Sequence, residues 1–318
     1  MFFRQAFENP NLEIVCIQSR SDVAMYAHLL KYDSAFGVWN KEVGVDADGF
    51  VIDGKRIPFI QSTEPSGDIW KTYNIDFVVE ASGKLKSIDE ASMHLDAGAK
   101  HVVLTSPGSH VDGTFVFGIN HEQFELGKHK VISAASCTTT CTALVVKVLE
   151  EKFGVERGFI NTVHAFTQDQ NLHDGSHKDL RRARSAVQSI IPTSTGVTKA
   201  LGELFSDLKG KFSGISFRVP VIVPSLISAT FELKKQVTKE EVNIAFEEAS
   251  KGDLQKSLAV TNLPLVSVDL VGSTAGSTVD LLSTDVVNGN MLNVVAWYDN
   301  EWGYVANVIR LLEFISTK

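Results

Sequence analysis

Short apolar runs separated by amphipathic segments make up the first 135 residues of the chain. The runs are rich in valine and isoleucine, which predicts buried strands, and the segment that begins at Asp22 has the spacing of a helix. Strands that alternate with helices in this way indicate a parallel sheet. The expected strands, with the turns that end them, are residues 12–18, 75–83, 101–107, 115–120 and 130–136.

The pattern changes after Cys137. Residues 138–153 have helical spacing, and many of the later runs alternate between apolar and polar positions. Such alternation predicts a sheet with one covered face. Amphipathic helices are expected from Lys239 and from Glu301 to the end of the chain. The expected strands in this half are residues 158–166, 213–220, 226–235, 264–272, 277–283 and 292–298.

Composition and charge narrow the class of protein. The chain has 318 residues, 44% of them hydrophobic and 21% charged, which is enough for two domains with separate cores. Its net charge of −8 provides no electrostatic basis for nucleic-acid binding. No apolar run approaches the ~18 residues that a membrane-spanning helix needs. We therefore expect neither a nucleic acid nor a membrane as a partner.

The cysteines and the N-terminus indicate a reducing compartment. The three cysteines are Cys16, Cys137 and Cys141, a number too small and odd for a disulfide framework. The first 11 residues, MFFRQAFENPN, are too polar for a signal peptide. A cytoplasmic location is expected.

Cys137 is the candidate nucleophile. It follows the expected strand 130–136 and begins the next helix, where free N–H groups and the helix dipole lower a thiol pKa and favour the reactive thiolate. Ser136 and Thr138 add hydroxyl and N–H donors for an anion. The alternative is that Cys137 is only a small buried residue at the start of the helix. For Cys141, which lies one turn later, we adopt this interpretation as a buried structural residue.

The segment Ser133–Cys141, SAASCTTTC, resembles the active-site signature of glyceraldehyde-3-phosphate dehydrogenases, SNASCTTNC, with Ala134 and Thr140 at the asparagine positions. The resemblance covers residues 1–318. It implies that Cys137 is the nucleophile and that His164, in the segment TVHA, is the catalytic base. A Cys–His pair activates the thiol and then moves the proton during hydride transfer. A lone histidine on this strand would otherwise be explained as a core residue.

The same resemblance implies two phosphate sites. Thr167 and Arg218 are expected to hold the substrate phosphate, and arginine suits it because its guanidinium binds phosphate in a bidentate way. The full set of expected phosphate-binding residues is Ser136, Thr138, Thr167, Arg182, Thr195, Gly196 and Arg218. Of these, Thr138, Arg182, Thr195 and Gly196 are expected to hold the attacking inorganic phosphate. Arg181 is an alternative to Arg182, and Asp169 and Arg184 are expected to form structural pairs in the loop.

The cofactor is expected to be NAD or NADP, and no metal is expected. By resemblance, Asn300 bonds the nicotinamide carboxamide and Tyr304 packs beside the ring, and Thr105 ends a strand where ligands gather. Most NAD-dependent members have an Asn-Asp pair in the segment where this chain has Gln18-Ser19-Arg20-Ser21, from which we expect Ser19 and Arg20 to bind the cofactor. Loss of that carboxylate and gain of an arginine suit a 2′-phosphate, so we hypothesise that NADP is accepted. The alternative is that these residues lie at the rim of the cofactor site and vary without an effect on cofactor choice.

The implied fold class is α/β. A Rossmann-type dinucleotide-binding domain is expected over residues 1–136, and an α+β catalytic domain with a mixed or antiparallel sheet over residues 137–300. The helix 301–318 is expected to pack back on the first domain. No G-x-G-x-x-G sequence occurs, and Met1–Gln5 resembles the helix that follows this loop in the family. We therefore expect that the family's central first strand and glycine loop are missing from a truncated chain.

The implied activity is NAD(P)-dependent oxidative phosphorylation of D-glyceraldehyde 3-phosphate to 1,3-bisphosphoglycerate through a Cys137 thioester, in a homotetramer. Two alternatives remain. An erythrose-4-phosphate dehydrogenase would use a similar catalytic pair but release an acid with water. A truncated chain without catalysis would act as a binding or scaffold protein.

Overall fold

The strands and helices divide between two units of the chain. The computed structural model describes residues 1–47 and 49–318. The first unit comprises residues 1–114, 123–134 and 311–318, and the second comprises residues 115–122 and 135–310.

The first unit is built from short strands and helices. Its helices are α1 (Phe2–Phe7), α2 (Val23–Lys31), α3 (Ile69–Thr72) and α4 (Ile88–Asp96). Its strands are β1 (Ile17–Ser19), β2 (Tyr32–Asp33), β3 (Gly37–Val38), β4 (Val43–Val45), β5 (Gly49–Ile52), β6 (Lys55–Gln61), β7 (Phe77–Glu80), β8 (His101–Leu104), β9 (Gly113–Thr114) and β10 (Val131–Ser133). The helix expected from Asp22 is confirmed as α2, and Asp22 is its N-cap, whose carboxylate accepts hydrogen bonds from the Ala24 and Met25 N–H groups.

Two four-stranded sheets form in this unit. One has the order β7-β8-β10-β9 with every pair parallel, which confirms the parallel sheet that the pattern predicts. The other has the order β1-β6-β5-β4, with β1 parallel to β6 and the remaining pairs antiparallel. The β5–β6 hairpin was not expected, although Asp53-Gly54, with φ of 47° and 80°, is a typical signal for its tight turn.

Two strand predictions in the first 135 residues are wrong in extent or type. The expected strand 12–18 is reduced to β1, because its ladder with β6 covers only Ile17–Ser19. The expected strand 115–120 is a turn, in which the Asn120 side chain accepts from the Val116 N–H at 2.9 Å. Gly118, at φ 87°, reverses the chain there.

The second unit is built around one large sheet and a buried helix. Its helices are α5 (Cys137–Phe153), α6 (Val197–Leu204), α7 (Lys239–Lys251) and α8 (Trp302–Ile315), whose last five residues belong to the first unit, and the short 3-10 helices are η1 (His121–Gln123, across the unit boundary), η2 (Ser206–Leu208), η3 (Ser267–Leu270) and η4 (Leu281–Ser283). Its strands are β11 (Val155–Ala165), β12 (Ile191–Thr193), β13 (Phe212–Val219), β14 (Ser225–Leu233), β15 (Leu258–Thr261), β16 (Ser277–Asp280), β17 (Asp285–Val287) and β18 (Met291–Tyr298).

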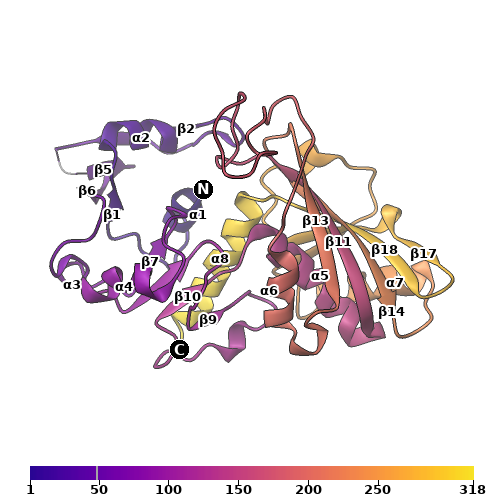
Figure 1. The fold of residues 1–318 in the computed structure, drawn as a ribbon. Helices are drawn as coiled ribbons and strands as arrows, with labels where there is room; N and C mark the ends of the chain where they lie inside the picture. Colours follow the sequence, from indigo (N-terminus) through magenta and orange to yellow (C-terminus); the bar gives the residue numbers. More distant parts are fainter. Residues whose placement is uncertain (48) are drawn as a thin grey trace. The chain divides into compact units, whose positions relative to one another are not determined.

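The large sheet is mixed, as expected. Its order is β12-β13-β11-β14-β18-β16-β15, and β17 pairs with β18. Strand β11 runs parallel to β13 and antiparallel to β14, and these strands lie side by side in Figure 1. The register places His164 opposite Arg218 on β13. Alternate residues of β14 are buried, in agreement with the predicted alternation.

Several segments of the second unit differ from the pattern. The expected strand 277–283 ends at Asp280, because the Asp280 carboxylate caps the 3-10 helix η4 that follows. The expected strand 264–272 contains the 3-10 helix η3, because the Asp269 carboxylate accepts from the Val266 N–H at 2.9 Å and closes a local turn. Strand β15 was not expected, and it pairs in parallel with β16. The helix predicted from Lys239 is confirmed as α7, which starts with a capping box between Thr238 and Glu241.

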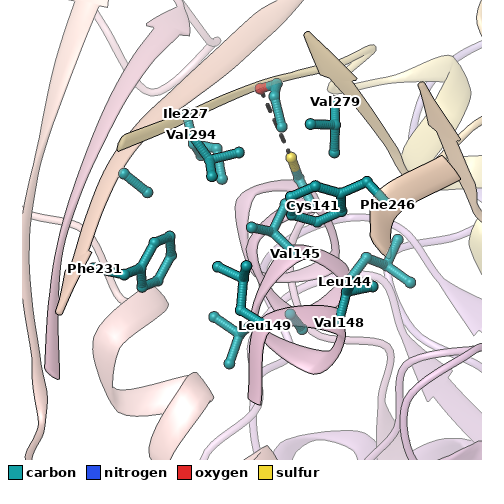
Figure 2. Packing of buried hydrophobic residues seen from close by; sticks show 14 of the residues in the cluster. Cys141, Leu144, Val145, Val148, Leu149, Ile227, Phe231, Phe246, Val279 and Val294 are labelled. Carbon is teal, nitrogen blue, oxygen red and sulfur yellow. Dashed lines mark hydrogen bonds between the residues drawn. The ribbon is translucent and has the colours of Figure 1, made fainter. Parts of the chain in front are cut away.

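Helix α5 forms the centre of the second unit's core. Figure 2 shows Leu144, Val145, Val148 and Leu149 packed among side chains of the sheet and of α7. Cys141 is fully buried there, and its Sγ lies 3.3 Å from the Ser277 Oγ, the contact that is dashed in Figure 2. This confirms that Cys141 is a buried residue. Packing on both sides fixes the helix, and therefore the position of its first residue, Cys137.

Within the described residues, the helices are too short or too polar to cross a bilayer.

Candidate active site

The first turn of α5 presents Cys137. Ser136 is the N-cap, and its Oγ accepts a 3.1 Å hydrogen bond from the Thr139 N–H. Ala135 precedes it with φ of 59°, a left-handed conformation that costs an alanine about 1 kcal/mol. The Tyr304 hydroxyl donates to the Ala135 carbonyl at 3.1 Å. Tyr304 therefore supports the strained turn that leads into the nucleophile.

His164 lies next to Cys137, near the end of β11. The Cys137 Sγ and the His164 Nε2 are 3.5 Å apart, and the histidine is buried. On the other side of the ring, Nδ1 lies 2.7 Å from the Ala165 carbonyl, which can only accept. Nδ1 therefore carries the proton in the neutral ring, and the Nε2 lone pair faces the thiol. The structure brings together the two residues that the sequence pairs as nucleophile and base.

Both members of the pair are neutral near pH 7 in this structure. Burial and, to a smaller extent, the Arg218 charge together lower the pKa of His164 to about 4. Burial also raises the pKa of the Cys137 thiol, against the opposing effects of hydrogen bonds from Thr138 and the charge of Arg218. The prediction that the helix terminus lowers the thiol pKa is therefore wrong for the free protein, because desolvation of the thiolate outweighs the favourable contacts.

Tyr298, at the end of β18, contacts the elements that carry Cys137 and His164. Its hydroxyl lies 2.9 Å from the Oγ1 of Thr138 and 2.9 Å from the Oγ1 of Thr162, and all three residues are buried. Its ring packs edge-on against His164 with centroids 5.9 Å apart. The Tyr298 hydroxyl thus ties the first turn of α5 to β11. The sequence analysis did not single out this residue, although it ends the strand before Asn300.

A cationic cluster lies beside His164. It consists of Arg218 and Arg182 with the polar residues that bind them, Thr167, Asp169 and Gln170. The Arg218 Nη1 donates to the Thr167 Oγ1 at 2.7 Å and to the Gln170 Oε1 at 3.2 Å. The Arg218 Nε is buried, and none of the described residues accepts a hydrogen bond from it. The cluster therefore retains a buried donor that an anion can satisfy.

Asp169 connects Thr167 to Arg182 within this cluster. Its carboxylate accepts from the Thr167 hydroxyl and from the Arg182 Nη1. Arg182 also donates from Nε to the Thr193 Oγ1 at 3.0 Å. Arg181 instead donates to the Pro192 carbonyl at 3.4 Å, so the structure places Arg182, rather than Arg181, in the cluster. The expected loop pair of Arg184 is present too, with Asp174 at 2.8 Å.

The other expected phosphate residues have local partners in this structure. The Ser136 and Thr138 hydroxyls are engaged by Thr139 and Tyr298. Thr195 and Gly196 stand at the N-terminus of α6, where the Thr195 Oγ1 accepts from the Val197 N–H at 3.3 Å. They follow Thr193, the partner of Arg182, by two and three residues. Their contact with a phosphate stays a prediction.

The expected cofactor residues are divided between the units. In the first unit, Ser19 ends β1 and the neighbouring Arg20 is exposed. The Thr105 hydroxyl bonds the Glu80 carbonyl at 3.0 Å, beyond the carboxyl ends of β8 and β7. In the second unit, Asn300 follows β18 and is buried. Strand ends of parallel sheets are common ligand sites, which fits Ser19 and Thr105.

Ser225 orients Asn300, and it is another residue that the sequence analysis missed. The Ser225 Oγ accepts from the Ala165 N–H at 3.0 Å and donates to the Asn300 Oδ1 at 2.8 Å. Its only proton is thus directed at the amide oxygen. The Asn300 oxygen is therefore engaged, and the expected contact of its NH₂ group with a carboxamide stays a prediction.

Comparison with known proteins shows two family matches. Residues 136–300 match the model described as "Glyceraldehyde 3-phosphate dehydrogenase, C-terminal domain", and residues 1–88 match "Glyceraldehyde 3-phosphate dehydrogenase, NAD binding domain". The second match begins at residue 1, so it does not support the expectation that the first strand of this domain is missing.

Curated relatives resemble the chain over nearly all of its length. It is 45% identical to glyceraldehyde-3-phosphate dehydrogenase 1 of Bacillus cereus, over 99% of this chain and 95% of the relative. The glyceraldehyde-3-phosphate dehydrogenase of Geobacillus stearothermophilus is 45% identical, over 99% of this chain and 94% of the relative. That of Priestia megaterium is 46% identical over the same shares.

Proposed function

The chain belongs to the glyceraldehyde 3-phosphate dehydrogenase family, and on that premise we propose that it oxidises D-glyceraldehyde 3-phosphate to 1,3-bisphosphoglycerate with NAD(P) and inorganic phosphate. The observation that carries the proposal is the 3.5 Å contact between the Cys137 Sγ and the lone pair of His164, next to a cationic cluster. A nucleophile, a base and an anion site together suit acyl transfer to phosphate.

In the first step, Cys137 attacks the aldehyde carbon. Because both partners are neutral, the thiol proton passes to the His164 Nε2 as the sulfur–carbon bond forms. The proton then moves to the carbonyl oxygen and yields a hemithioacetal. The N–H of Cys137 lies in the first turn of α5, where N–H groups have no partner within the helix, and with His164 it stabilises the developing oxyanion.

In the second step, His164 removes the hemithioacetal hydroxyl proton while hydride leaves the same carbon. Bound NAD(P) supplies the hydride acceptor. The product on Cys137 is a thioester. An oxygen of inorganic phosphate then attacks the thioester carbon, the carbon–sulfur bond breaks, and the acyl phosphate leaves. The thiol regains its proton and completes the cycle.

The cationic cluster supplies the specificity in this proposal. Arg218 and Thr167 hold the substrate phosphate, and the unpartnered Arg218 Nε adds a donor. Arg182 serves the attacking phosphate, together with Thr138, Thr195 and Gly196, whose N–H and hydroxyl groups complete the site. Ser136 contributes indirectly, since its hydroxyl caps α5.

The cofactor assignment rests on residues of each unit taken separately. The NH₂ group of Asn300, oriented by Ser225, suits the nicotinamide carboxamide, and Tyr304 lies within one turn of it. Ser19 and Arg20 suit the adenosine side, and Thr105 ends a neighbouring strand. The family supports NAD(P), and the exposed Arg20 suits a 2′-phosphate, so NADP is accepted as well as NAD in this proposal.

A homotetramer in the cytoplasm completes the proposal. The loop between β11 and β12 exposes apolar side chains, with Leu180 83% and Ile190 70% accessible. Large apolar side chains that stay exposed on one loop favour an interaction surface, so we expect this loop to contact other subunits. The three cysteines are free, as a reducing compartment requires. Sedimentation equilibrium of the purified protein tests the tetramer, and a monomer at micromolar concentration would contradict it.

The test of the activity is reduction of NAD or NADP by D-glyceraldehyde 3-phosphate, with and without phosphate. We expect turnover that requires phosphate and is lost in Cys137→Ala. The matched control is Cys16→Ser, a half-buried cysteine of the first unit, which should retain activity. Faster turnover of erythrose 4-phosphate with water would instead support the alternative dehydrogenase. The absence of turnover with either aldehyde would refute the proposed function and favour a binding protein.

A further inference from the structure

Asp169 occupies an unusual place in the cationic cluster. One carboxylate oxygen accepts from the Thr167 hydroxyl, which in turn accepts from Arg218. The other accepts from the Arg182 Nη1. Thr167 belongs to the site proposed for the substrate phosphate and Arg182 to the site proposed for the attacking phosphate. A single carboxylate therefore spans both sites.

The donors that Asp169 holds are those that a phosphate oxygen would use. The Thr167 hydroxyl has one proton and the structure directs it at Asp169, so it cannot also donate to a ligand. The Arg182 Nη1 is likewise engaged. A phosphate that binds Thr167 and Arg182 in full must take these contacts from the carboxylate, and a negative charge left beside it would repel it.

Arg182 does not need Asp169 in order to be held in place. Its Nε donates to the Thr193 Oγ1 at 3.0 Å, and Asp179 lies 3.6 Å away. The Asp179 carboxylate is fixed by the Thr193 hydroxyl at 2.9 Å. Asp169 is thus an additional partner, and its side chain is 45% exposed. It can turn into water at modest cost when an anion arrives.

We propose that Asp169 is a built-in competitor for the phosphate groups, a carboxylate that satisfies Thr167 and Arg182 in the free protein and is displaced when phosphate binds. The inference rests on the proposed phosphate sites. Its consequence is weaker anion binding than the arginines alone would produce, which favours release of the doubly phosphorylated product. An uncharged aldehyde cannot displace the carboxylate, so Asp169 also contributes to selection of phosphorylated substrates.

The test is calorimetric titration of the wild-type protein and of Asp169→Asn with inorganic phosphate at fixed ionic strength. We expect the variant to bind phosphate about threefold or more tightly, because each exposed charged contact is worth up to about 1 kcal/mol. Asp169→Ser repeats the measurement with a side chain that cannot reach both donors. The matched control is Asp174→Asn, which breaks a similar exposed pair with Arg184 in the same loop and should leave phosphate affinity unchanged.

The alternative role for Asp169 is a permanent brace for Arg182, and it predicts the opposite sign. Equal or weaker phosphate binding in both Asp169 variants would overturn the competitor role. Turnover is measured separately on the same preparations. Lack of turnover by the wild-type protein would refute the proposed function, while the phosphate titration would still decide the role of Asp169.

Discussion

The hydroxyl of Tyr298 lies 2.9 Å from the hydroxyl of Thr138, one residue after the nucleophile. The same Tyr298 oxygen lies 2.9 Å from the Thr162 hydroxyl, two residues before the base. One phenol thus connects the elements that carry Cys137 and His164. The 3.5 Å separation of the pair depends on this connection as well as on the packing of α5.

Substitution of Tyr298 by phenylalanine should damage both stability and catalysis. It leaves the buried Thr138 and Thr162 hydroxyls without this partner, at a cost of about 1–3 kcal/mol in the free energy of unfolding. Looser positioning of the pair should lower kcat more than it raises KM. Urea unfolding and steady-state kinetics measure the two effects. Tyr32→Phe, at a side chain that is 50% exposed, is the control. Equal stability of both variants would contradict the bracing role.

Alkylation of Cys137 should report a neutral pair rather than a preformed ion pair. Because burial raises the thiol pKa, the rate with iodoacetamide in the free protein should be low near pH 7 and should still rise as the pH passes the usual range of a thiol. Mass spectrometry in a Cys16→Ser background follows the single site, since Cys141 is buried, with a pKa raised to about 12. A rate that is already maximal and flat between about pH 6 and 8 would show a thiolate and contradict the neutral pair.

The acid limit of catalysis should lie well below the usual range of histidine. The His164 pKa is about 4 because of burial and the Arg218 charge, so the base stays unprotonated as pH falls from 7 to about 5. Activity should fall only when the pH approaches the lowered pKa. The measurement is kcat/KM against pH in the wild-type protein. In Arg218→Gln, loss of the positive charge should move the acid limb to higher pH, and a limb near pH 6.5 in the wild type would disprove the lowered pKa.

Replacement of Thr140 by valine should preserve or increase stability. The Thr140 Oγ1 is buried, and within the described residues no group bonds it, so the change removes an uncompensated polar atom, with a gain of up to about 1 kcal/mol. Thr142→Val is the matched control on the same helix. Its hydroxyl donates to the Thr138 carbonyl at 2.7 Å, and the loss should cost about 1 kcal/mol. Thermal unfolding distinguishes the two, and destabilisation of similar size in both would argue that Thr140 has an unrecognised partner.

Arg20→Ala tests the cofactor preference. If the exposed guanidinium binds a 2′-phosphate, its removal should lower kcat/KM for NADP by about tenfold and leave the value for NAD nearly unchanged. Arg157→Ala, at an arginine paired with Glu232 on the second unit's surface, is the control. A strong preference of the wild-type protein for NAD would disprove the hypothesis directly.

The sequence by itself determined the fold class and many of the longer helices and strands, and it predicted the residues of the site. Period-two and period-3.6 patterns identified β14 and α7, and short motifs identified Cys137, His164 and Arg218, because these signals lie within a few consecutive residues. It failed at β1 and at residues 115–120 and 264–272, where pairing registers and local hydrogen bonds decide between strand and turn. The tertiary structure alone decided the ionisation of Cys137 and His164, because desolvation depends on every element packed around them. It also decided the roles of Tyr298, Ser225 and Asp169, since their partners come from distant parts of the chain or from a loop whose path no periodicity specifies.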